Sequence, residues 1–190
     1  VELPPAGAGP NDRRYPIAIE GRGWHGLLHS PSTRIPGLVS LADVAPTQAE
    51  LLGFPFRAAD GTPMVEAIAG NETPPRLIVT MIWDAGGRNV LGRWKDDWPY
   101  LESLIPQGAW YEHATVGTSP TSTAQTHATI GTGAFPDAHG IVAHRLRIGD
   151  ELTTPWAKGP AYLVEPTLAD LYDRAMGNEP VVGEIGTVSI

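Results

Sequence analysis

The sequence contains no cysteine, and none of its apolar runs approaches the ~20 residues that a membrane-spanning helix needs. The first absence excludes disulfides and thiolate metal sites, and it removes the usual indicator of the redox compartment. The second absence predicts that no transmembrane segment lies within these 190 residues.

Basic side chains are also scarce, because 13 lysines and arginines stand against 21 aspartates and glutamates and give a net charge of −8. A nucleic-acid-binding surface normally carries a basic patch, so the balance argues against one. A phosphorylated small-molecule substrate remains compatible with an acidic chain if bound cations supply the local positive charge.

What the chain does contain is typical of a folded α/β protein. Hydrophobic residues make up 42 % of it, while 22 glycines and 19 prolines predict many loops. We expect residues 1–75 to form an irregular N-terminal segment with one short helix at Pro46–Leu52. We expect residues 76–190 to form the main domain.

The apolar run Leu77–Trp83 is the clearest predicted strand, and its continuous hydrophobicity predicts cover on both faces, as in a parallel sheet. Further strands are predicted at Tyr15–Ile19, Ile35–Leu41, Trp110–Val116, Gly140–Leu146 and Pro180–Ile190. Helices are predicted at Pro99–Ile105, from Thr126 onwards and at the amphipathic segment Thr167–Met176. Strands that alternate with helices indicate an α/β sheet with helices on both faces.

Two side chains in this pattern suggest chemistry. Asp84 follows the predicted strand Leu77–Trp83, and strand ends are where ligands and catalytic groups gather in open α/β sheets. Thr123 precedes a predicted helix, whose N-terminal N–H groups suit a phosphoryl oxygen. Taken singly, each has a structural reading, because an Asp before two glycines is a common turn residue and a Thr before a helix is a common N-cap.

Motifs that occur together favour the functional interpretation of Asp84 and Thr123 over the structural one. Two motifs follow the predicted strand that ends in Asp84: Pro120–Gly133 (PTSTAQTHATIGTG) and Pro136–Ile141 (PDAHGI). Together with that strand, they resemble the type I phosphodiesterase/nucleotide pyrophosphatase family of the alkaline phosphatase superfamily. The resemblance extends from residue 76 to about residue 146. It implies an alkaline-phosphatase-like, mostly parallel sheet with helices on both faces.

The resemblance also implies roles for individual residues. Asp84 would be a metal ligand, and Thr123 would be both the nucleophile and a metal ligand. His127 and His139 match positions that look structural. The family carries Phe-Pro-Asn where this chain has Ala124–Thr126, so Thr126 would take the place of a phosphate-binding asparagine without its amide.

The family's site holds two divalent metals, zinc by resemblance, and needs further Asp and His ligands that residues 127–190 do not supply in the expected pairs. We therefore expect the remaining ligands beyond Ile190 and a catalytic domain that is incomplete at the C-terminus. We also expect residues 1–190 to be inactive alone.

The leading hypothesis is a metal-dependent phosphodiesterase with a threonine nucleophile. The first alternative is a degenerate or truncated member that binds a ligand or partner without turnover, and the second is a phosphomutase relative with the same metal core. A sulfatase is disfavoured because the Cys/Ser-x-Pro-x-Arg pattern is missing. An extracytoplasmic location is implied by the family alone.

Overall fold

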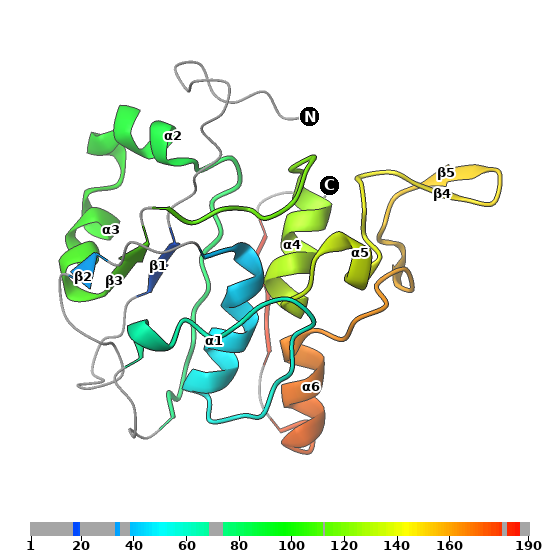
Figure 1. The fold of residues 1–190 in the computed structure, drawn as a ribbon, viewed down its shortest axis with the longest axis horizontal. Coiled ribbons are helices and arrows are strands. Elements are labelled where there is room, and N and C mark those ends of the chain that lie inside the picture. The colour runs from blue at the N-terminus through cyan, green and yellow to red at the C-terminus, as the bar shows by residue number, and fades with distance from the viewer. Residues whose placement is uncertain are drawn as a thin grey trace.

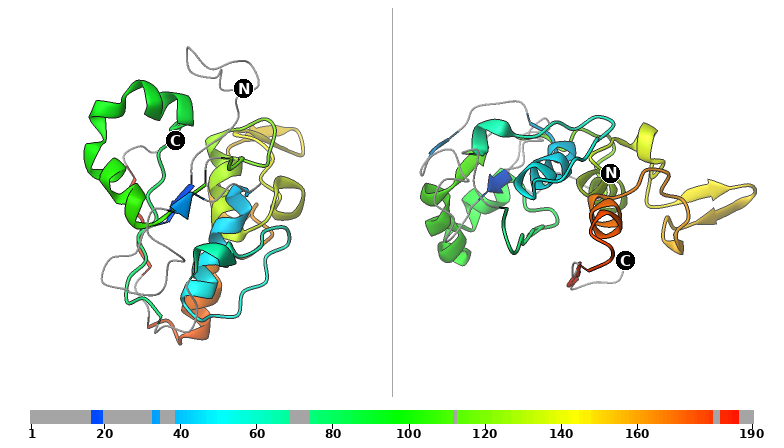
Figure 2. Two further views of the ribbon diagram at one scale, coloured as in Figure 1. Left: turned by 60° about the vertical axis from the view of Figure 1, so that its left-hand side comes forward. Right: turned by 90° about the horizontal axis from the view of Figure 1, so that it is seen from below.

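The computed structural model describes residues 17–19, 33–34, 39–68, 74–111, 113–179 and 182–186. Helix α4 (Thr123–Thr132) lies against α1 (Val44–Leu51), α5 (Pro136–His139) and α6 (Leu168–Ala175) in the middle of the molecule (Figure 1). A second group of helices, α2 (Arg88–Arg93) and α3 (Pro99–Leu104), stands apart from these on the far side of a small sheet (Figure 2). The 3-10 turns η1 to η4 cover Leu41–Asp43, Val65–Ala67, Lys95–Asp97 and Ile105–Gln107.

The described strands form small sheets. In the three-stranded sheet, β3 (Ala109–Tyr111) is central, pairing antiparallel with β1 (Ile17–Ile19) and parallel with β2 (Thr33–Arg34). Strands β4 (Leu146–Ile148) and β5 (Glu151–Thr153) form an antiparallel hairpin that projects from the body, and β6 (Ala157–Pro160) follows it (Figure 1). The chain is thus a mixture of helices and small sheets, and the large parallel sheet predicted from the sequence is not found among the residues described.

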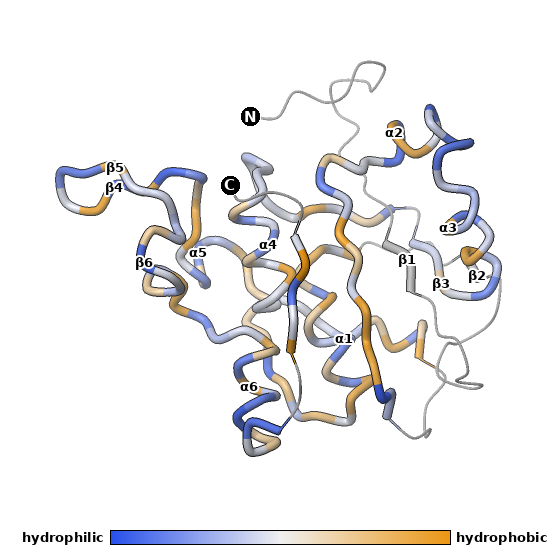
Figure 3. The backbone as a smooth tube through the Cα atoms, turned by 180° about the vertical axis from the view of Figure 1, so that it is seen from behind, coloured by the Kyte–Doolittle hydropathy of each residue, from blue (hydrophilic) through white to orange (hydrophobic). Residues whose placement is uncertain are grey.

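The largest difference from the sequence prediction concerns Leu77–Trp83. This segment lies in no strand, and Leu77 and Val79 are 77 % and 74 % exposed, so the prediction of a buried strand is wrong for this structure. Figure 3 shows it as a hydrophobic stretch running along the back of the molecule. Among the described residues, a hydrogen bond from the Gln48 amide to the Thr80 hydroxyl connects this segment to α1. An apolar run indicates that a segment suits burial, but it does not specify which element covers it.

The predicted strand Gly140–Leu146 is also wrong. Gly140 has φ +84°, a left-handed conformation that ends α5 and that a regular strand does not contain. The Ile141 N–H donates to Nδ1 of His139 at 3.0 Å instead of to a neighbouring strand. Strand β4 begins only where that prediction ends, at Leu146.

Three further strand predictions have mixed outcomes. Trp110–Val116 is a strand only as far as Tyr111, after which Thr115 makes a single parallel bridge to Ser40. The strand predicted at Ile35–Leu41 is described only from residue 39 onwards. There the structure has the bridge from Ser40 to Thr115 rather than a strand. Of Pro180–Ile190, residues 182–186 are described and lie in no strand.

The helix predictions and the first strand are confirmed. Helices α1, α3, α4 and α6 occupy the predicted places, although α4 begins three residues earlier than expected, at Thr123. Thr167 caps α6 by accepting from the Asp170 N–H at 3.1 Å, and the Asp170 carboxylate accepts from the Thr167 N–H at 3.0 Å. Strand β1 falls within the predicted Tyr15–Ile19.

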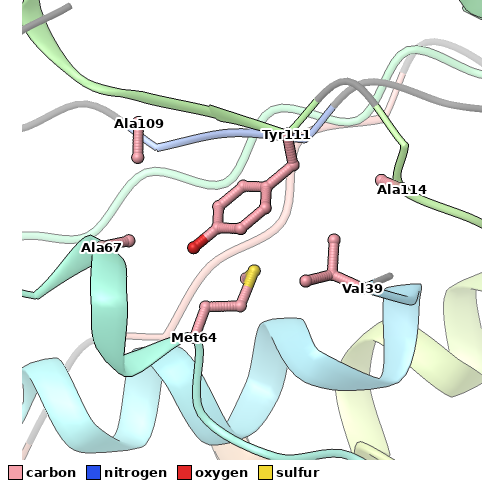
Figure 4. Packing of buried hydrophobic residues seen from close by; sticks show 6 residues of the cluster. All are labelled: Val39, Met64, Ala67, Ala109, Tyr111 and Ala114. Carbon is pink, nitrogen blue, oxygen red and sulfur yellow. The ribbon is translucent and has the colours of Figure 1, made fainter. Parts of the chain in front are cut away.

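Within the part of the chain that the structure describes, the buried apolar side chains form three small clusters rather than one large one. Between β3 and the segment after α1, the ring of Tyr111 extends towards Met64 within a cluster of small apolar residues (Figure 4). A second cluster joins α1 to α6 through Ala45, Ala49 and Leu168, and a third packs Ala124 of α4 against Ile141 and Leu146. Many of these side chains are alanines, so the elements approach each other closely but bury little apolar area per residue.

The predicted division between residues 1–75 and 76–190 stays a prediction. Strands β1 and β2 precede the boundary and pair with β3, which follows it. Helix α1 likewise packs against α4. No helix in the described ranges is both long and apolar enough to cross a membrane.

Tyr111 gives the first testable prediction. Burial of its side chain, together with the negative charges of Glu66 and Asp43, raises the pKa of the Tyr111 phenol well above its ordinary value. Because the raised pKa favours the neutral form in the folded state, this stability is fully present below about pH 10 and falls as the pH rises further, by up to about 1.4 kcal/mol per pH unit. Urea unfolding above about pH 10 should therefore show a steeper loss for the wild type than for Tyr111→Phe.

The matched control for this prediction is Tyr100→Phe, since Tyr100 is 62 % exposed. It should keep the wild-type dependence on pH. Parallel stability curves for the wild type and Tyr111→Phe would contradict the assignment.

Candidate functional site

The site begins at the N-terminus of α4. Ser122 is the extended N-cap residue, and Thr123 is the first helical residue. Thr123 is only 6 % exposed, which is unusual for a polar residue in the first turn of a helix. A buried hydroxyl needs a hydrogen-bond partner, and the position of that partner determines where the Thr123 oxygen points.

That partner is Asp84. The Thr123 hydroxyl donates to Oδ2 of Asp84 at 3.0 Å, across 39 positions of sequence. Asp84 lies in a tight turn in which the Gly86 N–H bonds the Trp83 carbonyl at 3.0 Å and Ala85 has φ +56°. A non-glycine residue in this left-handed region is strained, and such strain gathers at functional sites. The structure therefore brings the two principal residues named from the sequence into direct contact.

The pair supplies donors that fit a divalent cation. A carboxylate oxygen and a hydroxyl oxygen are hard ligands, and their 3.0 Å separation allows both to contact one ion. In the described ranges no group of three or more His, Cys, Asp or Glu side chains gathers at a metal-binding distance. Asp84 and Thr123 would supply two of the four donors that a tetrahedral zinc site requires.

Thr126, the residue predicted to bind substrate, lies one turn further along α4 and is partly buried. Its hydroxyl lies 3.0 Å from the Ser122 carbonyl and 3.2 Å from the Thr123 carbonyl, and donates within the helix. The Ser122 side chain makes no capping hydrogen bond, and its oxygen is buried without a partner among the residues described. The first-turn N–H groups of α4 are consequently not covered by a side-chain cap and face the region of Thr123.

Gln125 was not singled out from the sequence, but it fixes the start of α4. It is 1 % exposed, and its amide nitrogen donates to the carbonyls of Pro120 at 3.2 Å and Val142 at 2.8 Å. These contacts join the loop before α4 to the loop after α5. The signal in the sequence was a single amide side chain between Ala124 and Thr126, which does not distinguish a buried amide from an exposed one.

The two histidines of the motif have different environments. His127 is exposed on α4, whereas His139 is fully buried behind it. Nδ1 of His139 accepts from the Ile141 N–H at 3.0 Å, so the neutral ring carries its proton on Nε2, which lies 3.1 Å from the Thr129 hydroxyl. His139 therefore joins α5 to the middle of α4. Burial lowers the pKa of His139, which keeps the ring neutral.

Beside Asp84 there is a pocket of about 420 Å³ that the sequence reading did not predict. Trp83, Trp94 and Trp98 line it together with Asp84 and Asp97. Residues 83–98 hold half of the six tryptophans of the chain. That local enrichment was the available signal, but it has no helical or strand period that would place the rings on one face.

Comparison with known proteins supplies one match. The sequence profile of the family described as type I phosphodiesterase/nucleotide pyrophosphatase matches residues 78–183, which is more than half of the chain. The matched range includes Asp84, Thr123 and the whole of α4. Neither the curated proteins nor the solved structures gave a match.

The burial of His139 leads to a prediction at acid pH. Because the folded state lowers the pKa of His139, the neutral ring contributes stability above about pH 6.5, and this contribution is lost as the pH falls below it. Protonation would place a hydrogen on Nδ1, against the Ile141 N–H. His139→Asn keeps an acceptor near that N–H but does not titrate. It should be less stable than the wild type at neutral pH and should lose less stability on acidification from about pH 6.5 to 5.

Chemical unfolding across this pH range measures the effect, with His127→Asn, which changes an exposed histidine on α4, as the control. The control should follow the wild type. An acid loss that is unchanged in His139→Asn would show that other groups cause it.

Proposed function

The chain belongs to the type I phosphodiesterase/nucleotide pyrophosphatase family, and we propose that it is a metal-dependent phosphodiesterase with Thr123 as the nucleophile. Membership of this family suggests that the chemistry is hydrolysis of phosphoesters. The observation that carries the proposal is the 3.0 Å contact between the Thr123 hydroxyl and Oδ2 of Asp84. Its substrates are phosphorylated small molecules.

In the proposed reaction, the Thr123 oxygen attacks phosphorus in line with the leaving alcohol. The new bond joins Oγ1 to phosphorus as the hydroxyl proton is lost to solvent, and the bond from phosphorus to the leaving oxygen breaks as that oxygen takes up a proton from water and departs as the alcohol. Threonine then carries the remaining phosphomonoester as a phosphodiester, which water hydrolyses to release the phosphomonoester and restore the hydroxyl. Asp84 holds Oγ1 in position and accepts its hydrogen bond, so the oxygen enters the reaction already oriented. The threonine hydroxyl is otherwise a weak nucleophile at neutral pH.

Asp84 and Thr123 would hold the proposed zinc ion. A divalent cation at this place supplies positive charge that favours the alkoxide and offsets the charge that develops on the leaving oxygen. A second zinc ion is part of the proposal by family membership. The two donors support the first ion, and the proposal assigns no ligands of this chain to the second.

Thr126 is proposed to contact the phosphoryl group together with the first-turn N–H groups of α4. Support comes from its place one turn from Thr123 and from the absence of a side-chain cap at Ser122. For its hydroxyl to donate to a phosphoryl oxygen, it must leave the carbonyls of Ser122 and Thr123. We therefore expect Thr126 to contribute less than Thr123.

A second candidate function is ligand binding without turnover. It is favoured by the small number of metal donors beside Thr123 in the described ranges and by the sequence Ala124–Thr126 where relatives carry Phe-Pro-Asn. The two functions differ in one measurement, because only the enzyme releases the alcohol of a phosphodiester.

The finer features of the fold and location are also proposals. We propose from family membership alone that the fold is of the alkaline-phosphatase-like kind with a mostly parallel sheet. An extracytoplasmic location is proposed from family membership alone.

The nucleophile is tested with the protein expressed from its complete gene and an aryl phosphodiester as substrate. Thr123→Ala should lower kcat by at least about a thousandfold, since the variant lacks the hydroxyl that is proposed to take the phosphoryl group. Thr123→Ser should keep part of the activity, and Thr121→Ala, in the loop just before α4, should keep nearly all of it. Activity in Thr123→Ala close to that of the wild type would end the proposal. A complete absence of turnover in the zinc-loaded wild type would favour the binding function.

The metal ligand is tested separately by calorimetric titration of zinc into the protein stripped with a chelator. Asp84→Asn should weaken zinc binding by about ten- to a hundredfold, because the amide removes the negative charge from the site. Asp96→Asn, which changes a neighbouring exposed carboxylate, should bind zinc like the wild type. Equal zinc affinities in the two variants would place the metal elsewhere.

A further inference from the structure

The first turn of α4 carries the sequence of a capping box that the structure leaves open. Ser122 is the N-cap residue and Gln125 is the third helical residue, which is the Ser-x-x-Gln pattern of that motif. In a closed box the N-cap hydroxyl accepts from the third N–H, and the third side chain accepts from the N-cap N–H. Here the Ser122 side chain makes no capping hydrogen bond, and both its oxygen and Oε1 of Gln125 are buried without a partner among the residues described.

Helix α6 shows the closed form of the same motif within this chain. The Thr167 hydroxyl accepts from the Asp170 N–H at 3.1 Å, and Oδ2 of Asp170 accepts from the Thr167 N–H at 3.0 Å. The open box of α4 is therefore not a general property of helix starts in this protein. A buried polar atom without a partner costs free energy, so other contacts must favour the open form.

Those other contacts come from the amide nitrogen of Gln125. It donates to the Pro120 carbonyl at 3.2 Å and to the Val142 carbonyl at 2.8 Å, and the side chain is almost fully buried. If the amide turned back to close the box with Ser122, both carbonyls would lose this donor. The two hydrogen bonds of the amide nitrogen therefore hold the box open.

The same hydrogen bonds enclose Thr123. Because Thr123 lies between Pro120 and Gln125 in the chain, the bond between those two residues closes a short loop around it. The bond to Val142 ties this loop to the segment after α5. The Thr123 hydroxyl, 3.0 Å from Oδ2 of Asp84, is thus carried on a turn that is fixed from two directions. Such support matters for a nucleophile, since a displacement of about 1 Å can lower a rate about a hundredfold.

We propose that Gln125 is the positioning residue of the nucleophile. By bonding Pro120 and Val142 rather than closing the capping box with Ser122, its amide holds the first turn of α4 at the rotation that brings the Thr123 hydroxyl to Asp84. Gln125 acts through Thr123 and touches neither substrate nor metal. The geometric role does not depend on the proposed function, whereas the effect on turnover rests on it.

The geometric role is tested by a double-mutant cycle of Thr123→Val and Asp84→Ala, which measures the coupling between these two side chains from urea unfolding. The protein is expressed from its complete gene, and a chelator removes any contribution of metal. The cycle is run in the wild type and again in Gln125→Met, which keeps an unbranched side chain of similar length but has no amide. The coupling free energy should fall by at least about half in Gln125→Met. An unchanged coupling would overturn the proposal.

The matched control is Gln107→Met. Gln107 is exposed, and its amide donates to the Ser103 carbonyl at 3.0 Å, so this variant also removes an amide hydrogen bond. The coupling between Thr123 and Asp84 should keep its wild-type value in this background.

A second comparison does not depend on how well Gln125→Met folds. Ser122→Ala removes a hydroxyl that caps nothing in the open box, so it should leave the urea midpoint nearly unchanged. Thr167→Ala breaks the closed box of α6 and should lower the midpoint. Equal losses in the two variants would show that the box of α4 is closed in solution, which would overturn the proposal.

Turnover of an aryl phosphodiester separates this proposal from the proposed function. In an active enzyme, Gln125→Met should lower kcat by at least about tenfold and change KM by less than about twofold, because orientation of the nucleophile lowers the barrier without contributing to substrate binding. An unchanged kcat, or an effect on KM as large as that on kcat, would overturn the positioning role. If the wild type shows no turnover but the coupling falls in Gln125→Met, the positioning role stands and the proposed function fails.

Discussion

Helix α4 is held in place chiefly by hydrogen bonds from buried polar side chains. Its buried residues are Ala124 and four polar residues: Thr123, Gln125, Thr129 and Thr132. Apolar packing tolerates small shifts, whereas a buried hydrogen bond loses most of its value when its geometry changes. A helix fixed in this way has a well-defined rotation and depth, and these determine where the hydroxyl of Thr123 lies.

The same principle explains the surroundings of the helix. Gln125 ties its first turn to two loops, and His139 meets Thr129 near its middle. Thr132, at the end, donates to the Ala128 carbonyl and accepts from the Ala134 N–H. None of these hydrogen bonds involves Asp84. These hydrogen bonds hold α4 in position without occupying the hydroxyl of Thr123.

The sequence allowed prediction of helices α1, α3, α4 and α6 and of the residues that meet at the site, because caps, prolines and a linked motif are local signals. Helices α2 and α5 were not predicted. Nor did the sequence allow prediction of the environment of these residues. Leu77–Trp83 was expected to be buried on hydrophobicity alone, and the described chain leaves it exposed. Gly140–Leu146 was expected to be extended, yet the ring of His139 and the left-handed Gly140 impose a loop. In both cases the outcome depends on contacts between distant segments, which one sequence does not report.

The position of Asp84 shows how local and distant constraints combine. The carboxylate follows an exposed apolar segment, so it cannot be positioned by that segment's packing. It is positioned instead by its own strained turn and by Trp83, whose ring contacts Trp98 across the pocket. A ligand that fills the pocket would touch Trp83 and Asp84 together, and would thereby restrict the carboxylate that holds Thr123.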